Sequence, residues 1–288
     1  MMLSLAAVAV FAFQQADTTF TVEPGSRLMV SSVRGDITVR TWDRNQVRAV
    51  ADLTPGTRLV VENRGPQVVV RSSGRAQASA EYELTVPAWM ELNLTTVHGD
   101  IRITGTRGQV TAETVDGDVS ASGGTGFVSL HSVNGAVTLT GANGRIKLQS
   151  VNDDIRLTDA SGEIAAEGVN GTITLQRVES SSVELSTVSG DVLYHGSIKP
   201  NGRYRFASHS GDVTVALPEA AGAVVQVNTF SGSFESDYPV TLTESRPGKR
   251  FSFTIGNGSA RIDLESFSGE IRLKTAAALR QQGKDRDD

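Results

Sequence analysis

The stretch "TVDGDVSASGGTGFVSLHSVNGAVTLTGANGRIKLQSVNDDIRLT" runs from Thr114 to Thr158 and repeats one short pattern three times. Each copy reads Ser or Thr, Val, a polar residue, Gly or Asp, one further residue and an aliphatic residue. Successive copies are 18 residues apart. A fixed period of about 20 residues is typical of a solenoid, in which each coil buries its apolar face against its neighbours.

The same corner recurs ten times along the chain. The spacing is 18 residues, four times in succession, from Gly99 to Gly171, and then relaxes to 19, 21 and 21 residues. We therefore predict an all-β fold, a single-stranded β-helix or solenoid with coils of 18–21 residues. The predicted corner residues are Gly35, Gly99, Gly117, Gly135, Asp153, Gly171, Gly190, Gly211, Gly232 and Gly269.

The phase of the apolar residues predicts two short strands in each coil. Val128 and Leu130 fall on even numbers, whereas Val133, Val137 and Leu139 fall on odd numbers. Alternation with period two indicates a strand with one buried face. The change of phase requires a bend, because otherwise half of these residues would face water. One bend is expected at the "VNG" corner and the other at the "TGANGR" turn.

The residue types at the corner indicate turn chemistry. Gly accepts a positive φ angle without steric cost, and Asp, which replaces it at position 153, is among the few residues that tolerate that region. Stacked coils would place Asn134, Asn152 and Asn170 above one another as a hydrogen-bonded ladder. A second column of small polar residues is expected from Thr96, Thr114, Ser132 and Ser150.

Acidic residues follow most of the corner positions. A continuous column of carboxylates could bind calcium, which prefers several hard oxygen ligands. However, the calcium-binding β-roll repeat is absent and Ala136 interrupts the column, so turn chemistry is the favoured interpretation and no metal or cofactor is expected. The column comprises Asp36, Asp100, Asp118, Asp154, Asp191, Asp212 and Glu270, with Ala136, Thr172 and Ser233 at the interruptions.

Four regions are expected along the chain. Residues 1–16 have the apolar segment and the small-residue cleavage zone of a secretory signal peptide, although the positively charged start is missing. Residues 18–90 form an N-terminal β region that caps the solenoid, residues 91–275 form the solenoid repeats, and residues 276–288 form a disordered polar tail. The mature chain has no segment long enough to span a bilayer.

The last coils carry larger side chains than the others. Phe230, Phe234, Phe251, Phe253 and Phe267 all follow residue 217, and we expect them to fill a wider or terminal part of the core. His209 occupies a corner position that is Val or Phe in other repeats, which predicts a partly buried side chain. The remaining histidines, His98, His131 and His195, form no metal-binding or catalytic motif.

Composition excludes several classes of function. The net charge is −5 and charges of both signs are interspersed, so the sequence shows no basic face of the kind that nucleic-acid binding requires. The absence of Cys excludes disulfides, zinc–thiolate sites and cysteine nucleophiles. We predict no catalytic residue. A polysaccharide-active β-helix enzyme is the least favoured of the alternatives, although its acid pair could lie on one face of a solenoid.

The order of the motifs resembles the bacterial putative-adhesin domain family. The similarity rests on "VRGDITVRTWDRNQVRA", on "YELTVPAWMELNLTTVHGDI" and on the V-x-G-D-I series that ends in "SFSGEIRL", and it covers residues 20–275. The resemblance implies a single-stranded β-helix in the cell envelope or on the cell surface. It supplies no catalytic residues.

These observations predict an exported, non-enzymatic binding or structural module of the bacterial cell envelope, located in the periplasm, at the outer membrane or on the surface. Its partner would be an envelope protein or a glycan. Aligned polar side chains could grip an extended polymer by repeated weak contacts, and a candidate binding face contains Arg102, Arg156 and Arg272. A self-assembling envelope scaffold is the second alternative.

Overall fold

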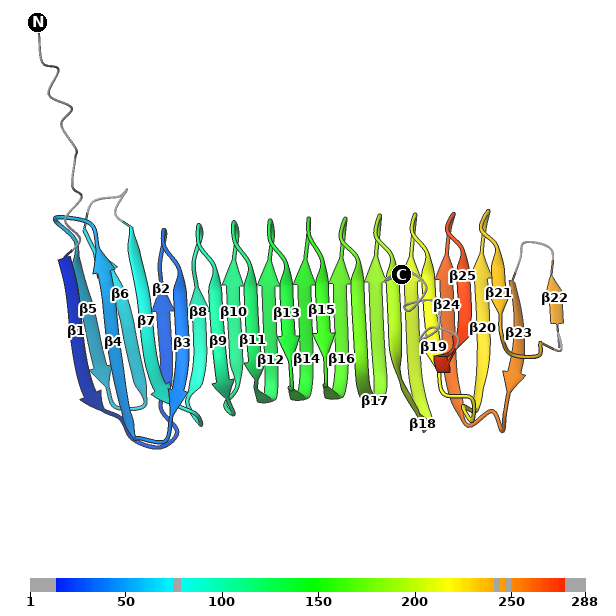
Figure 1. Ribbon diagram of the computed structural model, residues 1–288, viewed down its shortest axis with the longest axis horizontal. Helices are drawn as coiled ribbons and strands as arrows, with labels where there is room; N and C mark the ends of the chain where they lie inside the picture. The colour runs from blue at the N-terminus through cyan, green and yellow to red at the C-terminus, as the bar shows by residue number, and fades with distance from the viewer. Residues whose placement is uncertain (1–13, 75–78, 241–243, 247–249, 278–288) are drawn as a thin grey trace, which may run out of the picture.

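The computed structural model describes residues 14–74, 79–240, 244–246 and 250–277, and its strands stack along one axis into a rod (Figure 1). Most of the expected signal peptide, residues 1–16, and nearly all of the expected tail, residues 276–288, therefore lie outside the described residues. Within the described ranges, no helical segment has the length and apolarity that a membrane crossing requires.

Each regular coil consists of two strands separated by the repeated corner. In one coil these are β12 (Thr125–Ser132) and β13 (Val137–Thr140). They pair in parallel with β14 (Asn143–Ser150) and β15 (Ile155–Thr158), so that each residue lies beside the residue 18 positions later. The predicted solenoid with two strands per coil is thus confirmed.

The first of two sheets contains the strand that precedes each corner. Two long strands, β17 and β18, bend and contribute to both sheets. In spatial order the first sheet consists of β22 (Glu244–Arg246), β23 (Arg250–Ile255), β20 (Ala223–Thr229), β24 (Ala260–Ser266), the second halves of β18 (Val192–Ser208) and β17 (Ile173–Thr187), β16 (Ser161–Gly168), β14, β12, β10 (Val110–Thr114), β8 (Glu91–Thr95), β2 (Arg27–Ser31), β6 (Gln67–Ser73) and β5 (Arg58–Arg64).

The second sheet contains the strand that follows each corner. In spatial order it consists of β1 (Gln14–Thr21), β4 (Gln46–Leu53), β7 (Ala80–Pro87), β3 (Ile37–Trp42), β9 (Ile101–Thr106), β11 (Val119–Gly123), β13, β15, the first halves of β17 and β18, β19 (Val213–Leu217), β25 (Ile271–Thr275) and β21 (Phe234–Ser236).

Spatial order departs from chain order at both ends of the rod. The coil of β2 and β3 stacks directly on the coil of β8 and β9, while β4 to β7 continue outward (Figure 1). The coil of β24 and β25, which is last in the chain, lies between the coil of β18 and β19 and that of β20 and β21. Corner residues that are distant in sequence therefore become neighbours.

Antiparallel strands close both ends of the solenoid. At the N-terminal end β1 pairs with β4, β4 pairs with β7, and β5 pairs with β6, all antiparallel. At the opposite end β23 pairs antiparallel with β20 and β22. The predicted N-terminal β cap is confirmed, and β2 and β3, although they precede residue 91, already form a regular coil.

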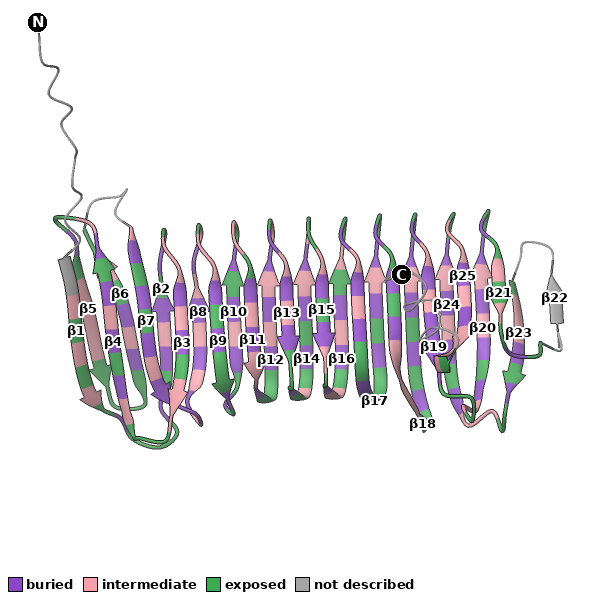
Figure 2. Cartoon of the chain, viewed as in Figure 1, coloured by how far each residue is buried: buried purple, intermediate pink, exposed green. Residues whose placement is uncertain are grey.

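The core lies between the two sheets and continues through the whole rod. Buried and exposed residues alternate along every regular strand (Figure 2). The inward positions carry aliphatic residues, for example Val128, Leu130, Val137 and Leu139, all with no accessible surface. Because identical positions recur in every coil, each aliphatic side chain packs on its counterparts above and below, and this burial of apolar area is the main stabilising contribution.

All four tyrosines of the chain, Tyr82, Tyr194, Tyr204 and Tyr238, are buried. Burial raises the pKa of Tyr82, Tyr194 and Tyr204, because the phenolate would lose its hydration. Burial, followed by the charges of Asp237 and Glu219, raises the pKa of Tyr238 to about 12. The Tyr238 hydroxyl also donates to the carbonyls of Leu217 and Pro218.

We predict that alkaline pH destabilises the fold through these tyrosines. Their pKa values are higher in the folded than in the unfolded chain, so their contribution is complete below pH ~10 and is lost as the pH rises through the folded values. Tyr238 alone would contribute at most about 2–3 kcal/mol of this loss. Urea unfolding across this range should give a smaller loss for Tyr238→Phe than for the unmodified protein. An equal loss in both proteins would contradict the assignment.

Candidate functional site

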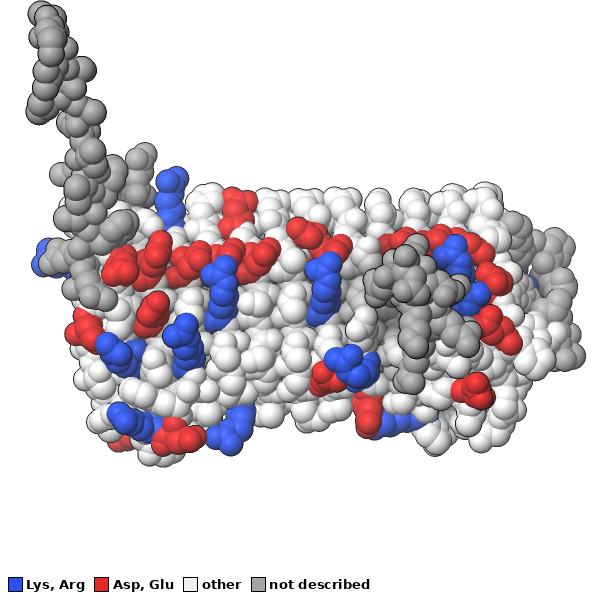
Figure 3. Space-filling model, in the orientation of Figure 1, with Lys and Arg blue, Asp and Glu red and all other residues white. Residues whose placement is uncertain are grey.

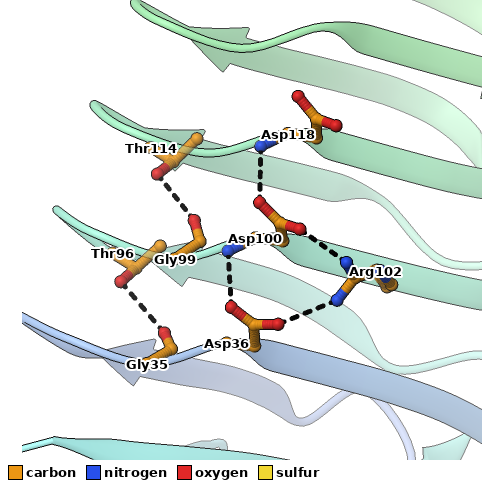
Figure 4. Close-up of polar contacts among 8 residues, drawn as sticks. All are labelled: Gly35, Asp36, Thr96, Gly99, Asp100, Arg102, Thr114 and Asp118. Carbon is orange, nitrogen blue, oxygen red and sulfur yellow. Dashed lines mark hydrogen bonds and ion pairs between the residues drawn. The ribbon is translucent and has the colours of Figure 1, made fainter.

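The repeated corner places columns of polar side chains along one edge of the rod (Figure 4). In the buried column, the hydroxyl of Thr114 donates to the carbonyl of Gly99 at 3.0 Å, and that of Ser132 donates to Gly117 at 2.8 Å. Each hydroxyl thus satisfies a carbonyl of the preceding coil. The predicted small polar column is confirmed and extends through Thr96, Thr114, Ser132, Ser150, Thr187, Ser208 and Ser266.

The corner glycines are required by close stacking of the backbone. A Cβ atom on Gly117 would lie 2.1 Å from the carbonyl oxygen of Gly99, and one on Gly135 would lie 2.0 Å from that of Gly117. The expectation that positive φ explains these glycines is wrong for most of them, since only Gly35, Gly99 and Gly117 have it. Asp153 has no positive φ either.

A pair of alanine substitutions separates steric contact from backbone conformation. Gly135 has no positive φ but faces the Gly117 carbonyl, whereas Gly141 has a φ of +71° and a Cβ atom on it would have no neighbouring atom within 4 Å. We expect Gly135→Ala to cost about 3 kcal/mol, because a packed backbone must move. Gly141→Ala should cost only about 1–2 kcal/mol. Thermal unfolding measures both, and an equal cost would argue against close stacking as the constraint.

The carboxylates that follow the corners accept hydrogen bonds from the next coil. Asp36 accepts from the backbone N–H of Asp100 at 2.9 Å, and Asp100 accepts from that of Asp118 at 2.8 Å (Figure 4). The same bond joins Asp118 to Ala136, Asp154 to Thr172, Asp191 to Asp212, and Asp212 to Glu270. The favoured interpretation, turn chemistry, therefore describes the column.

Ala136 and Asp153 are linked exceptions to this pattern. Ala136 has no carboxylate to offer the N–H of Asp154 in the next coil. That N–H instead donates to Asp153, its own neighbour, at 2.7 Å. The only non-glycine corner residue thus supplies the acceptor that the coil below lacks, which accounts for a departure that sequence alone left unexplained.

A double-mutant cycle tests this compensation. Asp153→Gly removes the acceptor and should cost about 1 kcal/mol, the usual net value of a hydrogen bond. In an Ala136→Asp background the same substitution should cost much less, because a carboxylate at position 136 would accept from Asp154. Urea unfolding of the four proteins gives the coupling energy. A coupling energy of zero would show that the two positions are independent.

The predicted binding-face arginines pair with carboxylates of the acidic column. Figure 3 shows basic side chains beside a row of acidic ones on the face of the rod that it draws. Arg102 bridges Asp36 at 2.9 Å and Asp100 at 2.5 Å, and the hydrogen bond to Asp36 is the main reason that the pKa of Arg102 is raised. Arg156 pairs with Asp154 at 2.6 Å. Their side chains remain 50% and 54% exposed, so they offset part of the negative charge of the column and still face solvent.

Arg272 makes the equivalent bridge near the far end of the rod. Its guanidinium binds Asp212 at 2.9 Å and also Glu270. Burial lowers the pKa of Arg272, but the hydrogen bond to Glu270 and the charge of Asp212 outweigh burial, so the pKa is raised overall. The three arginines share one face but lie several coils apart, and none contacts another.

The predicted asparagine ladder is present and continues beyond the asparagines. Asn170 donates to Asn152 at 2.8 Å, Asn152 donates to Asn134 at 2.5 Å, and Asn134 donates to Asp116 at 2.6 Å. The hydrogen bond from Asn134 is the main cause of the lowered pKa of Asp116, to which His98 adds through its Nδ1 at 2.7 Å. Among the described residues, no group of three or more His, Cys, Asp or Glu side chains is arranged to hold a metal ion.

Three aromatic rings occupy the outer valine position of the last corners. Phe267 lies between His209 and Phe230, with ring centroids 4.7 Å apart on each side and interplanar angles of 17° and 6°. Phe230 is 71% exposed and Phe267 is 46% exposed, and His209 is also exposed. We call this stack the aromatic ladder.

The aromatic ladder corrects two predictions. Phe230 and Phe267 do not fill the core, and His209 is not a partly buried residue. Phe253 is buried as expected, and Phe234 and Phe251 pack against the core. Sequence reasoning could have found the ladder, since His209, Phe230 and Phe267 occupy the position of outward-facing Val115 and Val188.

Two sheets of parallel strands, wound in coils of 18–21 residues with satisfied polar corners, define an adhesin-like β-solenoid domain. The chain belongs to the Toastrack DUF4097 family, whose model matches residues 128–274, about half of the sequence. This confirms the resemblance to the putative-adhesin family, for which no molecular function is known. Among curated proteins, none matches the chain.

Two solved structures resemble the chain. One is a putative cell adhesion protein from Clostridium sporogenes ATCC 15579, 12% identical, covering 91% of this chain and 100% of its own, with a TM-score of 0.22. The other is a putative adhesin from Parabacteroides distasonis ATCC 8503, 11% identical, covering 90% of this chain and 97% of its own, with a TM-score of 0.36. At these TM-scores the likeness carries no structural argument.

Proposed function

We propose that this chain is an exported, non-enzymatic binding module of the bacterial cell envelope. Its ligand would be an extended envelope polymer or a partner protein held by many weak contacts along the rod. The observation that carries the proposal is the 18-residue register, which aligns equivalent side chains of successive coils in straight rows. Family membership among adhesin-like domains supports it.

The rows are regular enough to match a repeating ligand. Neighbouring strands in a sheet are ~4.8 Å apart, so each row offers one side chain at about that interval. On the second sheet one such row runs outward through Arg102, Ser120, Thr138, Arg156 and Thr174. Hydroxyl and guanidinium groups in one line can donate to successive oxygen atoms of a polymer.

The use of the acidic side chains favours binding over catalysis. A glycosidase needs one carboxyl group free to protonate the leaving oxygen and a second to act as base or nucleophile. In the acidic column, one oxygen of Asp36 and of Asp100 accepts a backbone N–H, and the other binds Arg102. Both oxygens of these carboxylates are therefore already engaged within the fold.

Export in this proposal depends on the N-terminal leader, residues 1–16. Strand β1 begins at Gln14 and pairs along its length with β4. Cleavage after residue 16 would leave the β1 residues Asp17–Thr21 paired with β4, so the cap would keep its outermost strand.

The test is a pull-down in which the purified protein is exposed to envelope fractions of the source cell. The material that the protein retains is measured. We expect saturable binding at micromolar protein concentration. Replacing Arg102, Arg156 and Arg272 together by Gln should weaken it at least tenfold if that face binds, because three charge-assisted hydrogen bonds are lost. Gln is preferred to Glu, which would add carboxylates beside the acidic column and disturb the fold.

A matched control changes three ion-paired arginines on the first sheet. Arg27, Arg71 and Arg145 pair with Glu91, Glu62 and Glu163 and lie on the opposite face. Their replacement by Gln should leave binding unchanged. Equal loss in both triple variants would remove the arginine face from the proposal, and absence of any saturable partner would overturn the binding function itself.

A further inference from the structure

Exposure of the aromatic ladder to water is energetically unfavourable unless a ligand covers the rings. Val occupies the same outer corner position at residues 33, 97, 115, 133, 151, 169 and 188, so the corner does not need an aromatic residue to fold. Phe230 nevertheless leaves 71% of its surface in solvent. Exposed apolar surface of this kind, gathered in one place, marks an interaction site more often than a structural requirement.

The stacking order decides which ring surfaces remain available. Phe267 is sandwiched, so its two faces contact His209 and Phe230. Phe230 belongs to the coil of β20 and β21, and β21 pairs on one side only, with β25. Within the described part of the chain no further corner follows in this direction, so the outer face of Phe230 and the edges of all three rings are open.

Polar side chains border the ladder. A hollow of about 450 Å³ lies between the rings and the outer surface of the first sheet. Ala207 is small and leaves room beside the rings. Asn228 and Glu265 also line the hollow. Glu265 is held by Arg205 at 2.9 Å. The hollow therefore combines apolar ring surface with an amide, a carboxylate and a nearby guanidinium.

Three backbone N–H groups at these corners are already used between coils. The N–H of Ser231 donates to Phe267, that of Phe267 donates to Ser208, and that of Ser268 donates to His209. Addition of a strand requires free backbone donors and acceptors. These three N–H groups are therefore not available to a ligand at the ladder.

We propose that His209, Phe230 and Phe267, with Asn228 and Glu265, form a glycan-binding subsite that takes a pyranose ring of an envelope polysaccharide. A pyranose has one face of C–H groups, which packs on an aromatic ring, and hydroxyl groups at its rim, which pair with amide and carboxylate groups. The hollow has the size of known ligand sites. This inference rests on the proposed binding function and names its ligand class.

The test uses a panel of soluble oligosaccharides as probes: cellohexaose, chitohexaose, xylohexaose, mannohexaose and maltohexaose. Calorimetric titration of the purified protein should show saturable binding of at least one. The double substitution Phe230→Val and Phe267→Val should weaken that binding by about tenfold or more, since two aromatic contacts with the ligand are lost. Asn228→Ala should weaken it through loss of the polar contact.

Valine residues at the same corner position provide the controls for correct folding. Val is the residue used at this position in other coils, so the double variant should keep the thermal stability of the unmodified protein. Val33→Ala and Val115→Ala change exposed residues of the same column in coils distant from the hollow and should leave oligosaccharide binding unchanged.

Failure of this inference differs from failure of the binding function. If envelope material is retained but the double variant retains it equally, the subsite is wrong and the binding module stands. If none of the five oligosaccharides binds, the glycan assignment is overturned, and retention of an envelope protein would then identify the ligand class. If the double variant unfolds, Asn228→Ala decides: unchanged oligosaccharide binding would overturn the subsite.

Discussion

The close approach of one coil's corner to the next is the constraint on which the rest of the structure depends. A single additional carbon at Gly135 would lie 2.0 Å from the carbonyl oxygen of Gly117. Hydrogen bonds between the parallel strands set the spacing of the coils at ~4.8 Å, and corners without a Cβ atom can keep that spacing, so every column stays aligned. This spacing allows Ser132 to reach the Gly117 carbonyl and Asp118 to reach the backbone N–H of Ala136.

In the acidic column, hydrogen bonds and ion pairs offset the electrostatic repulsion between carboxylates of neighbouring coils. Carboxylates one coil apart repel each other, which would destabilise the rod if they were left uncompensated. All of them except Glu270 accept a backbone N–H of the next coil, Glu270 pairs with Arg272, and arginines such as Arg102 bridge two carboxylates. Where Ala136 removes a carboxylate, Asp153 restores the lost acceptor locally. At this corner the loss of one carboxylate is compensated by a second substitution in the next coil.

The outer valine position accepts a wider range of side chains than the corner glycine position. It faces solvent, so its side chain is not restricted by packing between coils. Val115 and Val188 occupy it in the middle of the rod, and aromatic residues replace them only near the last corners, where Phe230 and Phe267 stack. Structural demands thus concentrate on the inner corner, whereas recognition can vary along the outer edge.

The sequence by itself determined the solenoid, its two strands per coil, the corner residues and the polar columns, because an 18-residue repeat with period-two alternation permits few other folds. Only the tertiary structure decided which coils are neighbours at the two ends. The coil that contains Phe267 lies between those of His209 and Phe230, although Phe230 precedes it in the chain. This order rests on the parallel pairing of β24 with both β18 and β20, and no local pattern encodes these long-range contacts.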